Sequence, residues 1–334
     1  MKFKLSYLIL FNIFSVNLLF AQSLPHTFSA NSAAKAEEVN ENFLFLANQF
    51  KVNKKTIDCS TDNMTKAIED GYNHLVLNGT CSENLLITSF IGLFEEEHSS
   101  IYGLESNKPV TSLTLEGGTQ GVWDNTNKGI QHSVIFGGVL SIVNLTVKQI
   151  ISLNTGGKLF VDNSSLEKIT NIGGGSVEIK NSTLRCDSSY TNACVYIEDA
   201  GALKMDNVTL TNEGSEGAID ILRSSTAQIK NSTINNSGGE PITVQYNSSL
   251  QLEDTTVSSS SAGTFVGFYG YIHLNGGSMT RTSGTPTIEV KGPSIFHIEN
   301  NGTIADITCD GSLAHIDIGS SSASITNKNG AACQ

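Results

Sequence analysis

A short motif recurs along the chain, and this repeat constrains the fold more than any other feature. Each copy is an apolar-x-apolar piece that ends in Asn or Asp, followed by two residues and a further apolar residue, as in Ile179-Lys-Asn181-Ser-Thr-Leu184. The intervals between successive copies are 19, 18, 26, 24 and 23 residues. A period in the twenties is typical of a solenoid. The six copies centre on Asn144, Asn163, Asn181, Asn207, Asn231 and Asp254.

The pieces before each Asn alternate apolar and polar residues, as in Leu203-Lys-Met205 and Leu250-Gln-Leu252. A second alternating set lies between the copies and includes Val195-Tyr-Ile197, Ile219-Asp-Ile221 and Val266-Gly-Phe268. Such alternation indicates half-buried strands. With two or three strands per turn and no helical pattern between them, the sequence predicts an all-β fold. We expect a single right-handed parallel β-helix of roughly nine turns, in which each copy of the repeat contributes one turn.

The recurrent Asn has a physical explanation. A tight corner between strands needs a residue that tolerates left-handed backbone and bonds nearby backbone groups. Stacked about 4.8 Å apart, such side chains can bond the corner above and below, as amide ladders do. Many of these Asn also lie in Asn-x-Ser/Thr triplets, so N-glycosylation is the competing interpretation. The triplets recur in phase with the strands, which favours the ladder.

The Asn ladder and the alternating columns resemble the right-handed parallel β-helix, or pectin-lyase-like, superfamily. The segments Gly79–Ile87 and Leu113–Gly117 are similar to the first turns of such proteins, and the resemblance spans about residues 57–328. It implies the fold, whereas the superfamily hosts many activities. The motifs of polygalacturonases, pectate lyases and pectin esterases are absent, and Val122-Trp123-Asp124 matches the pectate lyase signature only superficially. The chain therefore has no recognisable catalytic motif.

Three regions precede or form this repeat. Residues 1–21 read as a signal peptide, with Lys2 and Lys4 before the apolar run Leu5–Phe20, although an uncleaved anchor is the alternative. Residues 22–56 are a leader segment, similar to leaders of exported bacterial proteins, with an amphipathic helix over 33–50. Residues 57–334 form the β-helix, with a helix near 64–70 as its N-terminal cap. We expect an exported bacterial protein, secreted, periplasmic or at the cell surface, that does not span a membrane.

The six cysteines all follow the signal, and their even number fits disulfides in an oxidising compartment. Six cysteines allow 15 pairings, of which pairing of sequence neighbours is the simplest. No CxxC occurs and the spacings do not suit zinc. The pairs expected are Cys59–Cys81, Cys186–Cys194 and Cys309–Cys333.

The net charge of the chain excludes one class of partner. Lys+Arg 20 against Asp+Glu 32 gives −12, and removal of Lys2 and Lys4 leaves 18 against 32, or −14. Such an acidic chain lacks the positive charge that binds nucleic acid.

The predicted helix over 33–50 has one apolar face, which is formed by Val39, Phe43, Leu46 and Phe50. This helix either packs on the next domain or forms a homotrimer.

The best candidate surface is the outward column of the second strand set. We expect Tyr196, Asp220, Thr243, Gly267 and Glu289 to share it. Aromatic, carboxylate and amide groups there are suited to a sugar chain, although a plain solvated face is the alternative interpretation of this column. The leading functional hypothesis is a binding or surface-interaction protein for a glycan or envelope polymer. The substrate-binding residues expected are Tyr196, Asp220, Gln245, Tyr246, Tyr269, Glu289 and Lys291.

Two other functions stay open. Glu198 and Asp220 would lie on adjacent turns with Cα atoms roughly 8 Å apart, within the range for inverting glycosidases. With Arg223, they are weak catalytic candidates for a polysaccharide lyase or glycoside hydrolase. A structural spike or fibre module, trimerised through residues 33–50, is the third hypothesis.

No cofactor is expected. His273 and His297 occupy one outward column 24 residues apart, and stacked surface histidines are favoured over a metal pair. Calcium is compatible with the many outward carboxylates, but no EF-hand or nonapeptide repeat supports it.

Overall fold

The computed structural model describes residues 35–37, 39–42, 52–83, 85–88, 112–124, 132–154, 156–171, 174–187, 193–282, 284, 286–300, 302–311, 313–319 and 323–328. The chain forms two units, residues 1–52 and 53–334. In the first unit, residues 36–37 and 39–42 are helical, and the Val39 N–H donates to the Lys35 carbonyl at 3.1 Å. These residues agree with part of the helix expected over 33–50. The predicted signal peptide and the remaining residues of the predicted leader up to 51 lie outside the described residues.

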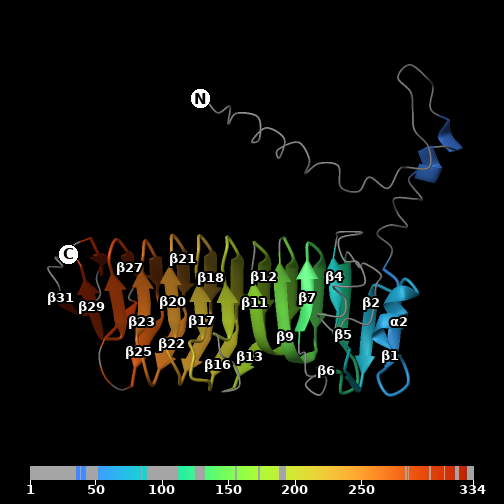
Figure 1. Ribbon diagram of the computed structural model, residues 1–334, viewed down its shortest axis with the longest axis horizontal. Coiled ribbons are helices and arrows are strands. Elements are labelled where there is room, and N and C mark those ends of the chain that lie inside the picture. Colours follow the sequence, from blue (N-terminus) through green and yellow to red (C-terminus); the bar gives the residue numbers. More distant parts are fainter. Residues whose placement is uncertain are drawn as a thin grey trace, which may run out of the picture. The chain divides into compact units, whose positions relative to one another are not determined.

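The second unit is a parallel β-solenoid of about nine turns, which confirms the all-β prediction. Its turns follow one another in chain order, from the strands near β1 to those near β31 (Figure 1). The right-handed sense of the coil stays a prediction. Three parallel rows of strands make up the solenoid, here called rows A, B and C.

Row A is a 12-stranded sheet that precedes the Asn corners. It has more strands than the solenoid has full turns because it includes strands such as β1, which is followed by helix α2 (Met64–Glu69). Its strands are β1 (Lys54–Asp58), β2 (His74–Asn78), β5 (Ser112–Gly117), β8 (Val139–Val143), β10 (Lys158–Asp162), β12 (Ser176–Lys180), β15 (Ala202–Asp206), β18 (Thr226–Lys230), β21 (Ser249–Glu253), β24 (Tyr271–Asn275), β27 (Ile295–Glu299) and β30 (His315–Asp317).

Row B follows the Asn corner in each turn, and row C follows row B. Row B contains β3 (Thr80–Cys81), β6 (Val122–Asp124), β13 (Thr183–Cys186), β16 (Thr209–Asn212), β19 (Thr233–Asn236), β22 (Thr256–Ser259), β25 (Ser278–Arg281) and β28 (Thr303–Ile304). Row C contains β4 (Leu86–Thr88), β7 (His132–Phe136), β14 (Val195–Ile197), β17 (Ile219–Ile221), β20 (Ile242–Gln245), β23 (Thr264–Gly267), β26 (Ile288–Lys291), β29 (Asp306–Asp310) and β31 (Ser324–Lys328). Strands β9 (Thr146–Asn154) and β11 (Ser165–Asn171) are long enough to run through both rows.

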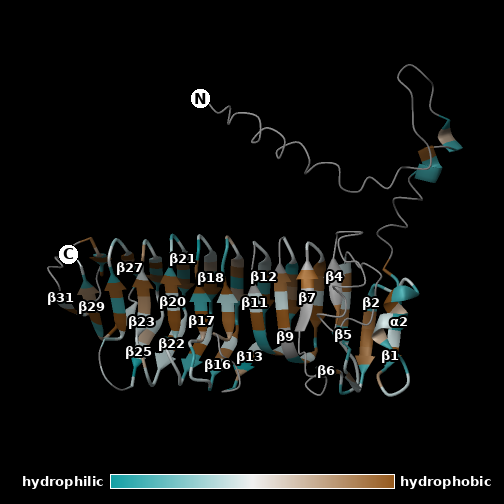
Figure 2. Cartoon of the chain, in the orientation of Figure 1, coloured by the Kyte–Doolittle hydropathy of each residue, from teal (hydrophilic) through white to brown (hydrophobic). Residues whose placement is uncertain are grey.

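The predicted alternation places one apolar column inside each row. In row A, Leu203 pairs with Ala227, which pairs with Leu250 on the next strand. Each of these side chains is at most 7% exposed, while the residues between them face outward. Brown and hydrophilic colours accordingly alternate along many strands (Figure 2). At about 25 cal/mol per Å² of buried apolar surface, these stacked columns are the main source of stability.

The Asn corners adopt the left-handed backbone that the sequence predicts. All six positions from Asn144 to Asp254 have φ between 47° and 55°. The ladder, however, is only partly continuous. Asn163 Nδ2 donates to Asn144 Oδ1 at 2.7 Å, and Asn207 Nδ2 donates to Asn181 Oδ1 at 3.0 Å.

At other turns the corner amide bonds an aspartate instead. Asn181 Nδ2 donates to Asp162 Oδ1 at 2.9 Å, and Asn231 Nδ2 donates to Asp206 Oδ1 at 2.9 Å. The predicted ladder is therefore confirmed at the two Asn–Asn contacts, whereas the amides of Asn181 and Asn231 donate to an aspartate of the preceding turn. A carboxylate just before the previous corner is a stronger acceptor than an amide and competes with it.

A buried serine directly follows the corner Asn at three turns, at Ser164, Ser182 and Ser232. Ser164 and Ser182 are buried, and the Ser164 N–H donates to the Ser182 hydroxyl at 3.1 Å. Each of these hydroxyls also donates to the carbonyl two residues back, as Ser164 does to Asp162 at 2.8 Å. The same arrangement recurs at Ser232, whose hydroxyl accepts from Val208 N–H at 3.1 Å. The hydroxyls of these serines therefore satisfy backbone groups inside the corners that they reach.

Substitution at Asn231 separates backbone conformation from side-chain bonding. Asn231→Ala is expected to lower the free energy of unfolding by about 1–2 kcal/mol, because alanine is disfavoured at φ near 48°. Asn231→Gly is expected to cost less than about 1 kcal/mol, since glycine tolerates this φ. Urea denaturation of both variants measures the difference. Equal losses would contradict the claim that backbone conformation dominates at these corners.

The N-terminal end is closed by the predicted helix and disulfide. Helix α2 (Met64–Glu69) begins at Asn63, whose side chain accepts from the Lys66 N–H at 2.8 Å. Buried Glu83 accepts from the Met64 N–H at 2.8 Å, and the Glu83 carbonyl accepts from Trp123 Nε1 at 2.8 Å. These bonds tie the cap to the first turns.

The disulfide prediction is confirmed for two pairs. Cys59–Cys81 and Cys186–Cys194 are bonded, with Cα atoms 4.9 Å and 5.7 Å apart. The third expected pair, Cys309–Cys333, includes Cys333, which lies outside the described residues.

Candidate functional site

The corner between rows C and A has an unusual backbone at four successive turns. Each of these corners contains two consecutive residues with positive φ, between 51° and 67°. Such conformations cost roughly 1–2 kcal/mol for residues other than glycine, and bulky side chains seldom adopt them. The pairs are Asp199–Ala200, Arg223–Ser224, Tyr246–Asn247 and Phe268–Tyr269.

Three of these strained residues are aromatic and exposed. Tyr246, Phe268 and Tyr269 are 46%, 53% and 65% exposed, respectively. The Tyr246 and Phe268 rings stack with centroids 5.1 Å apart and planes 10° apart. We call these three residues the aromatic corner. Neither a strained backbone nor an exposed aromatic ring stabilises the fold, so these residues indicate a functional role.

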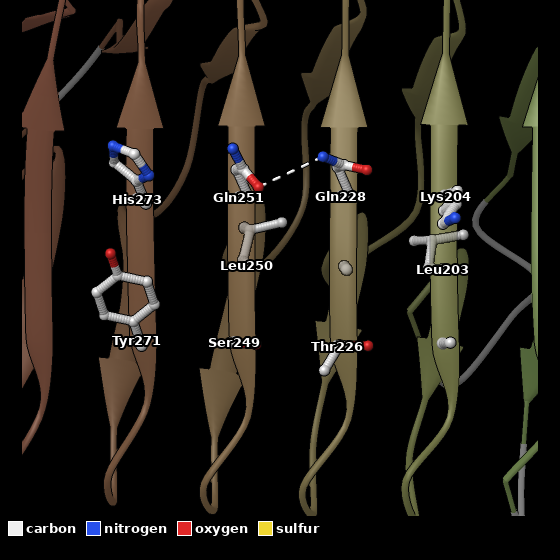
Figure 3. Close-up of a pocket in the computed structure, with 11 residues that line it drawn as sticks. Leu203, Lys204, Thr226, Gln228, Ser249, Leu250, Gln251, Tyr271 and His273 are labelled. Carbon is white, nitrogen blue, oxygen red and sulfur yellow. Dashed lines mark hydrogen bonds between the residues drawn. The ribbon is translucent and has the colours of Figure 1, made fainter.

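The aromatic corner borders a trough on the outer face of row A. The trough has a volume of about 400 Å³. Figure 3 shows two rows of side chains across it, with Tyr271, Ser249 and Thr226 in one row. The other row contains His273, Gln251, Gln228 and Lys204, and Gln228 Nε2 donates to Gln251 Oε1 at 3.4 Å (Figure 3). Small residues on β15, β18 and β21 leave space that Tyr271 bounds at one end.

The corner and the trough are adjacent in the chain. Tyr246 is three residues before Ser249, the first residue of β21, and Tyr269 is two residues before Tyr271, the first residue of β24. The aromatic side chains therefore lie at the edge where these strands enter the trough. Stacking rings next to hydroxyl and amide groups form a surface with both apolar and hydrogen-bonding character.

The predicted outward column of row C is mostly confirmed. Tyr196 pairs with Asp220, which pairs with Thr243, as expected. The next position holds Phe265, which pairs with Glu289, whereas Gly267 lies beside Gln245. The placement of Gly267 in this column is therefore wrong.

The reason is where β23 ends. Val266 is buried, but Phe268 has left the strand for the corner and does not face inward. Phe265 takes the outward position, with Lys291 Nζ 5.3 Å from its ring centroid. Lys291 Nζ also lies 3.1 Å from Glu289 Oε1. This end of the column is thus an aromatic ring with an ion pair beside it.

The three catalytic candidates fall into two groups. Glu198 is only 7% exposed, and its Oε2 accepts from Arg223 Nη1 at 2.7 Å and from the Tyr196 hydroxyl at 3.1 Å. Arg223 Nη1 also lies 3.7 Å from Asp199 Oδ1. Burial and the hydrogen bond to Glu198 raise the pKa of Tyr196 to about 12. Glu198 and Arg223 therefore connect consecutive corners, which is a structural arrangement.

Asp220 lies in a different environment. Burial raises the pKa of Asp220 to about 6, and Glu240 and Glu216 act in the same direction. A hydrogen bond with Thr243 and the charge of Lys168 act against this rise in pKa. Lys168 is itself 4% exposed, and burial lowers its pKa, with Glu216 and Asp220 opposing.

The sequence did not indicate Lys168. The register between β9 and β11 shifts between Leu166 and Lys168, so alternation is interrupted there. The only signal in the sequence is the spacing of three between Leu166 and Ile169, both of which are buried.

The environment of Asp220 predicts a pH dependence of stability. A carboxyl with a pKa of about 6 when folded and about 4 when unfolded destabilises the ionised folded protein by up to about 3 kcal/mol. This cost is present above pH 6 and disappears as the pH falls towards 4. Asp220→Asn is therefore expected to be more stable than the wild type at pH 7 and similar at pH 4.

Thermal unfolding between pH 4 and 8 measures this difference. Glu289→Gln is the matched control, since Glu289 lies in the same outward column with Lys291 as a surface partner. A variant Asp220→Asn that is less stable at pH 7, or whose advantage does not change with pH, would contradict the assigned environment.

No protein-family model, curated protein or solved structure matches this chain. In the part of the chain that the structure describes, every helix is too short or too polar to span a bilayer.

Proposed function

We propose that this protein is an exported binding protein for an uncharged polysaccharide, held at the aromatic corner and the adjoining trough. The observation that carries the proposal is the exposed aromatic group in strained backbone at Tyr246, Phe268 and Tyr269. Aromatic rings present a large apolar face with little conformational entropy to lose, so they suit contact with the apolar face of a sugar ring.

The trough supplies the complementary polar groups. Gln228, Gln251, Thr226, Ser249 and Tyr271 offer amides and hydroxyls, which both donate and accept hydrogen bonds. Lys204 is the one cation among the trough residues, while the chain as a whole has a net charge of −12. A strongly anionic polymer would meet overall repulsion, which favours an uncharged ligand.

Export and family membership belong to the same proposal. The disulfides fit an oxidising compartment, and residues 1–21 have the pattern of a signal peptide. The parallel solenoid with Asn corners supports the pectin-lyase-like resemblance. The homotrimer through residues 33–50 stays a prediction, as does the fibre function that depends on it.

Affinity electrophoresis in gels that contain a soluble polysaccharide tests the proposal. We expect one or more neutral glucans or xylans to retard the protein. Polygalacturonate should retard the protein less, and lowering the salt concentration should not increase that retardation. Retardation by polyanions alone would contradict the ligand class. Failure to bind any polysaccharide would contradict the function.

A second function has one specific observation in its favour. Asp220 has a raised pKa of about 6 and lies near the buried Lys168, as expected for a general acid. We infer that any cleavage of the bound polymer would depend on Asp220 rather than on Glu198, which is held by Arg223. New reducing or unsaturated ends from the wild type, lost in Asp220→Asn, would establish this alternative.

A further inference from the structure

Three ionisable side chains lie together near the C-terminal end of row A, and a fourth lies beside one of them. His273 on β24, His297 on β27 and Asp317 on β30 are consecutive partners in the register. The two imidazole rings stack with centroids 5.0 Å apart and planes 19° apart, which confirms that they lie on successive turns. Glu299, two residues after His297 on the same strand, completes the group.

The distances among these groups suit a shared ion. Glu299 Oε2 lies 3.4 Å from His273 Nε2, and Glu299 Oε1 lies 3.4 Å from His297 Nε2. Asp317 Oδ2 lies 3.5 Å from His297 Nε2. Two ligand atoms bound tetrahedrally at about 2.1 Å are about 3.4 Å apart. One ligand atom each from His273, His297 and Glu299 lies within 4.8 Å of the other two.

A second observation points to a missing partner. The Nε2 atom of His273 is buried, and among the described residues it accepts or donates no hydrogen bond. The side chains of His273 and His297 are 19% and 27% exposed, so an ion entering here would keep limited contact with water. A buried ring nitrogen without a hydrogen bond is costly, and coordination of a cation would satisfy it.

We propose that His273, His297 and Glu299 form a binding site for a divalent transition metal of the zinc and copper class. Two imidazole nitrogens and a carboxylate suit these ions, whereas calcium and magnesium favour oxygen ligands alone. Three protein ligands leave one tetrahedral position for a solvent oxygen, and Asp317 lies beside His297 at the edge of the site. The metal joins β24 and β27 near the C-terminal end of row A.

The test is a calorimetric titration of the purified, chelator-treated protein with Zn²⁺, with Mg²⁺ and Ca²⁺ as comparison ions. We expect saturable Zn²⁺ binding, an increase in Tm with Zn²⁺ but not with Mg²⁺ or Ca²⁺, and visible absorption typical of tetrahedral Co²⁺ when cobalt replaces zinc. A metal that binds the folded protein alone raises its stability in proportion to the logarithm of free metal over Kd.

Substitution of two proposed ligands tests whether the metal binds at this site. His297→Gln and Glu299→Gln are each expected to raise the Zn²⁺ Kd at least tenfold and to abolish the increase in Tm. His74→Gln is the matched control, because His74 Nε2 also lies 2.7 Å from a carboxylate, that of Glu116, on the same sheet. The side chains of His297 and Glu299 are partly exposed, so in the presence of chelator the Tm of both variants should match that of the wild type. Absence of saturable Zn²⁺ binding, or an affinity that these variants leave unchanged, would overturn the proposal.

Discussion

Affinity for an uncharged polysaccharide is expected to fall by roughly tenfold to two thousandfold when Tyr246, Phe268 and Tyr269 are replaced together by alanine. Each ring that stacks on a ligand contributes about 0.5–1.5 kcal/mol, and tenfold corresponds to about 1.4 kcal/mol. The three side chains are exposed, so their removal leaves the core intact. Affinity electrophoresis on the polysaccharide that binds the wild type most tightly measures the loss.

Stability distinguishes this loss from unfolding. Tyr269→Gly is expected to weaken binding while leaving the free energy of unfolding unchanged or raising it by up to about 1 kcal/mol, because glycine tolerates positive φ. Tyr269 has a φ of 67° and is 65% exposed. A substitution that lowers function without lowering stability is the behaviour expected of a residue kept for binding.

Phe160→Ala provides the matched control. Phe160 is an aromatic residue of row A, 41% exposed, and it lies on β10, outside the trough. Its removal is expected to leave polysaccharide affinity unchanged. Equal losses of affinity in Phe160→Ala and in the corner variant would show that exposed aromatic residues bind non-specifically, which would contradict the assigned site.

Trp123→Ala is expected to lower the free energy of unfolding by about 3–5 kcal/mol, the largest stability effect anticipated for one residue. Trp123 is fully buried and its Nε1 donates to the Glu83 carbonyl. Glu83 in turn accepts from the first residue of α2. The substitution therefore opens a cavity and also breaks the connection to the N-terminal cap.

Trp123→Phe separates these two contributions, since phenylalanine fills most of the volume but lacks the donor. We expect it to lose about 1–3 kcal/mol, mainly from the unsatisfied Glu83 carbonyl. Because solenoid turns interact mainly with their neighbours, hydrogen exchange should accelerate most in β1, β2 and α2. A loss below about 1 kcal/mol in Trp123→Ala would contradict the role of this contact.

The period and the alternation predicted the solenoid because a repeat of this length has few other ways to bury one apolar column per strand. The left-handed corners at Asn144 to Asp254 were also predictable, since few residue types tolerate that backbone. The hydrogen-bond partners were not. Whether Asn231 donates to Asn207 or to Asp206 depends on side-chain geometry within the corner.

The site was predicted in part. Tyr246 and Tyr269 were expected to contact a ligand, but Phe268 was expected to face inward. Alternation cannot show where a strand ends, and Phe265-Val-Gly-Phe268 places an aromatic residue at both ends of the same segment. The trough was not predicted, because it depends on which small residues become neighbours across β15, β18 and β21.

Hydrogen exchange of the protein with and without its best polysaccharide ligand tests the central claim most directly. We expect slower exchange in peptides that cover residues 244–251 and 266–274, where the aromatic corner leads into the trough. Exchange in the Asp220 cluster, around residues 216–221, should change little. Protection confined to that cluster, or spread evenly over the solenoid, would contradict the assignment of the binding site.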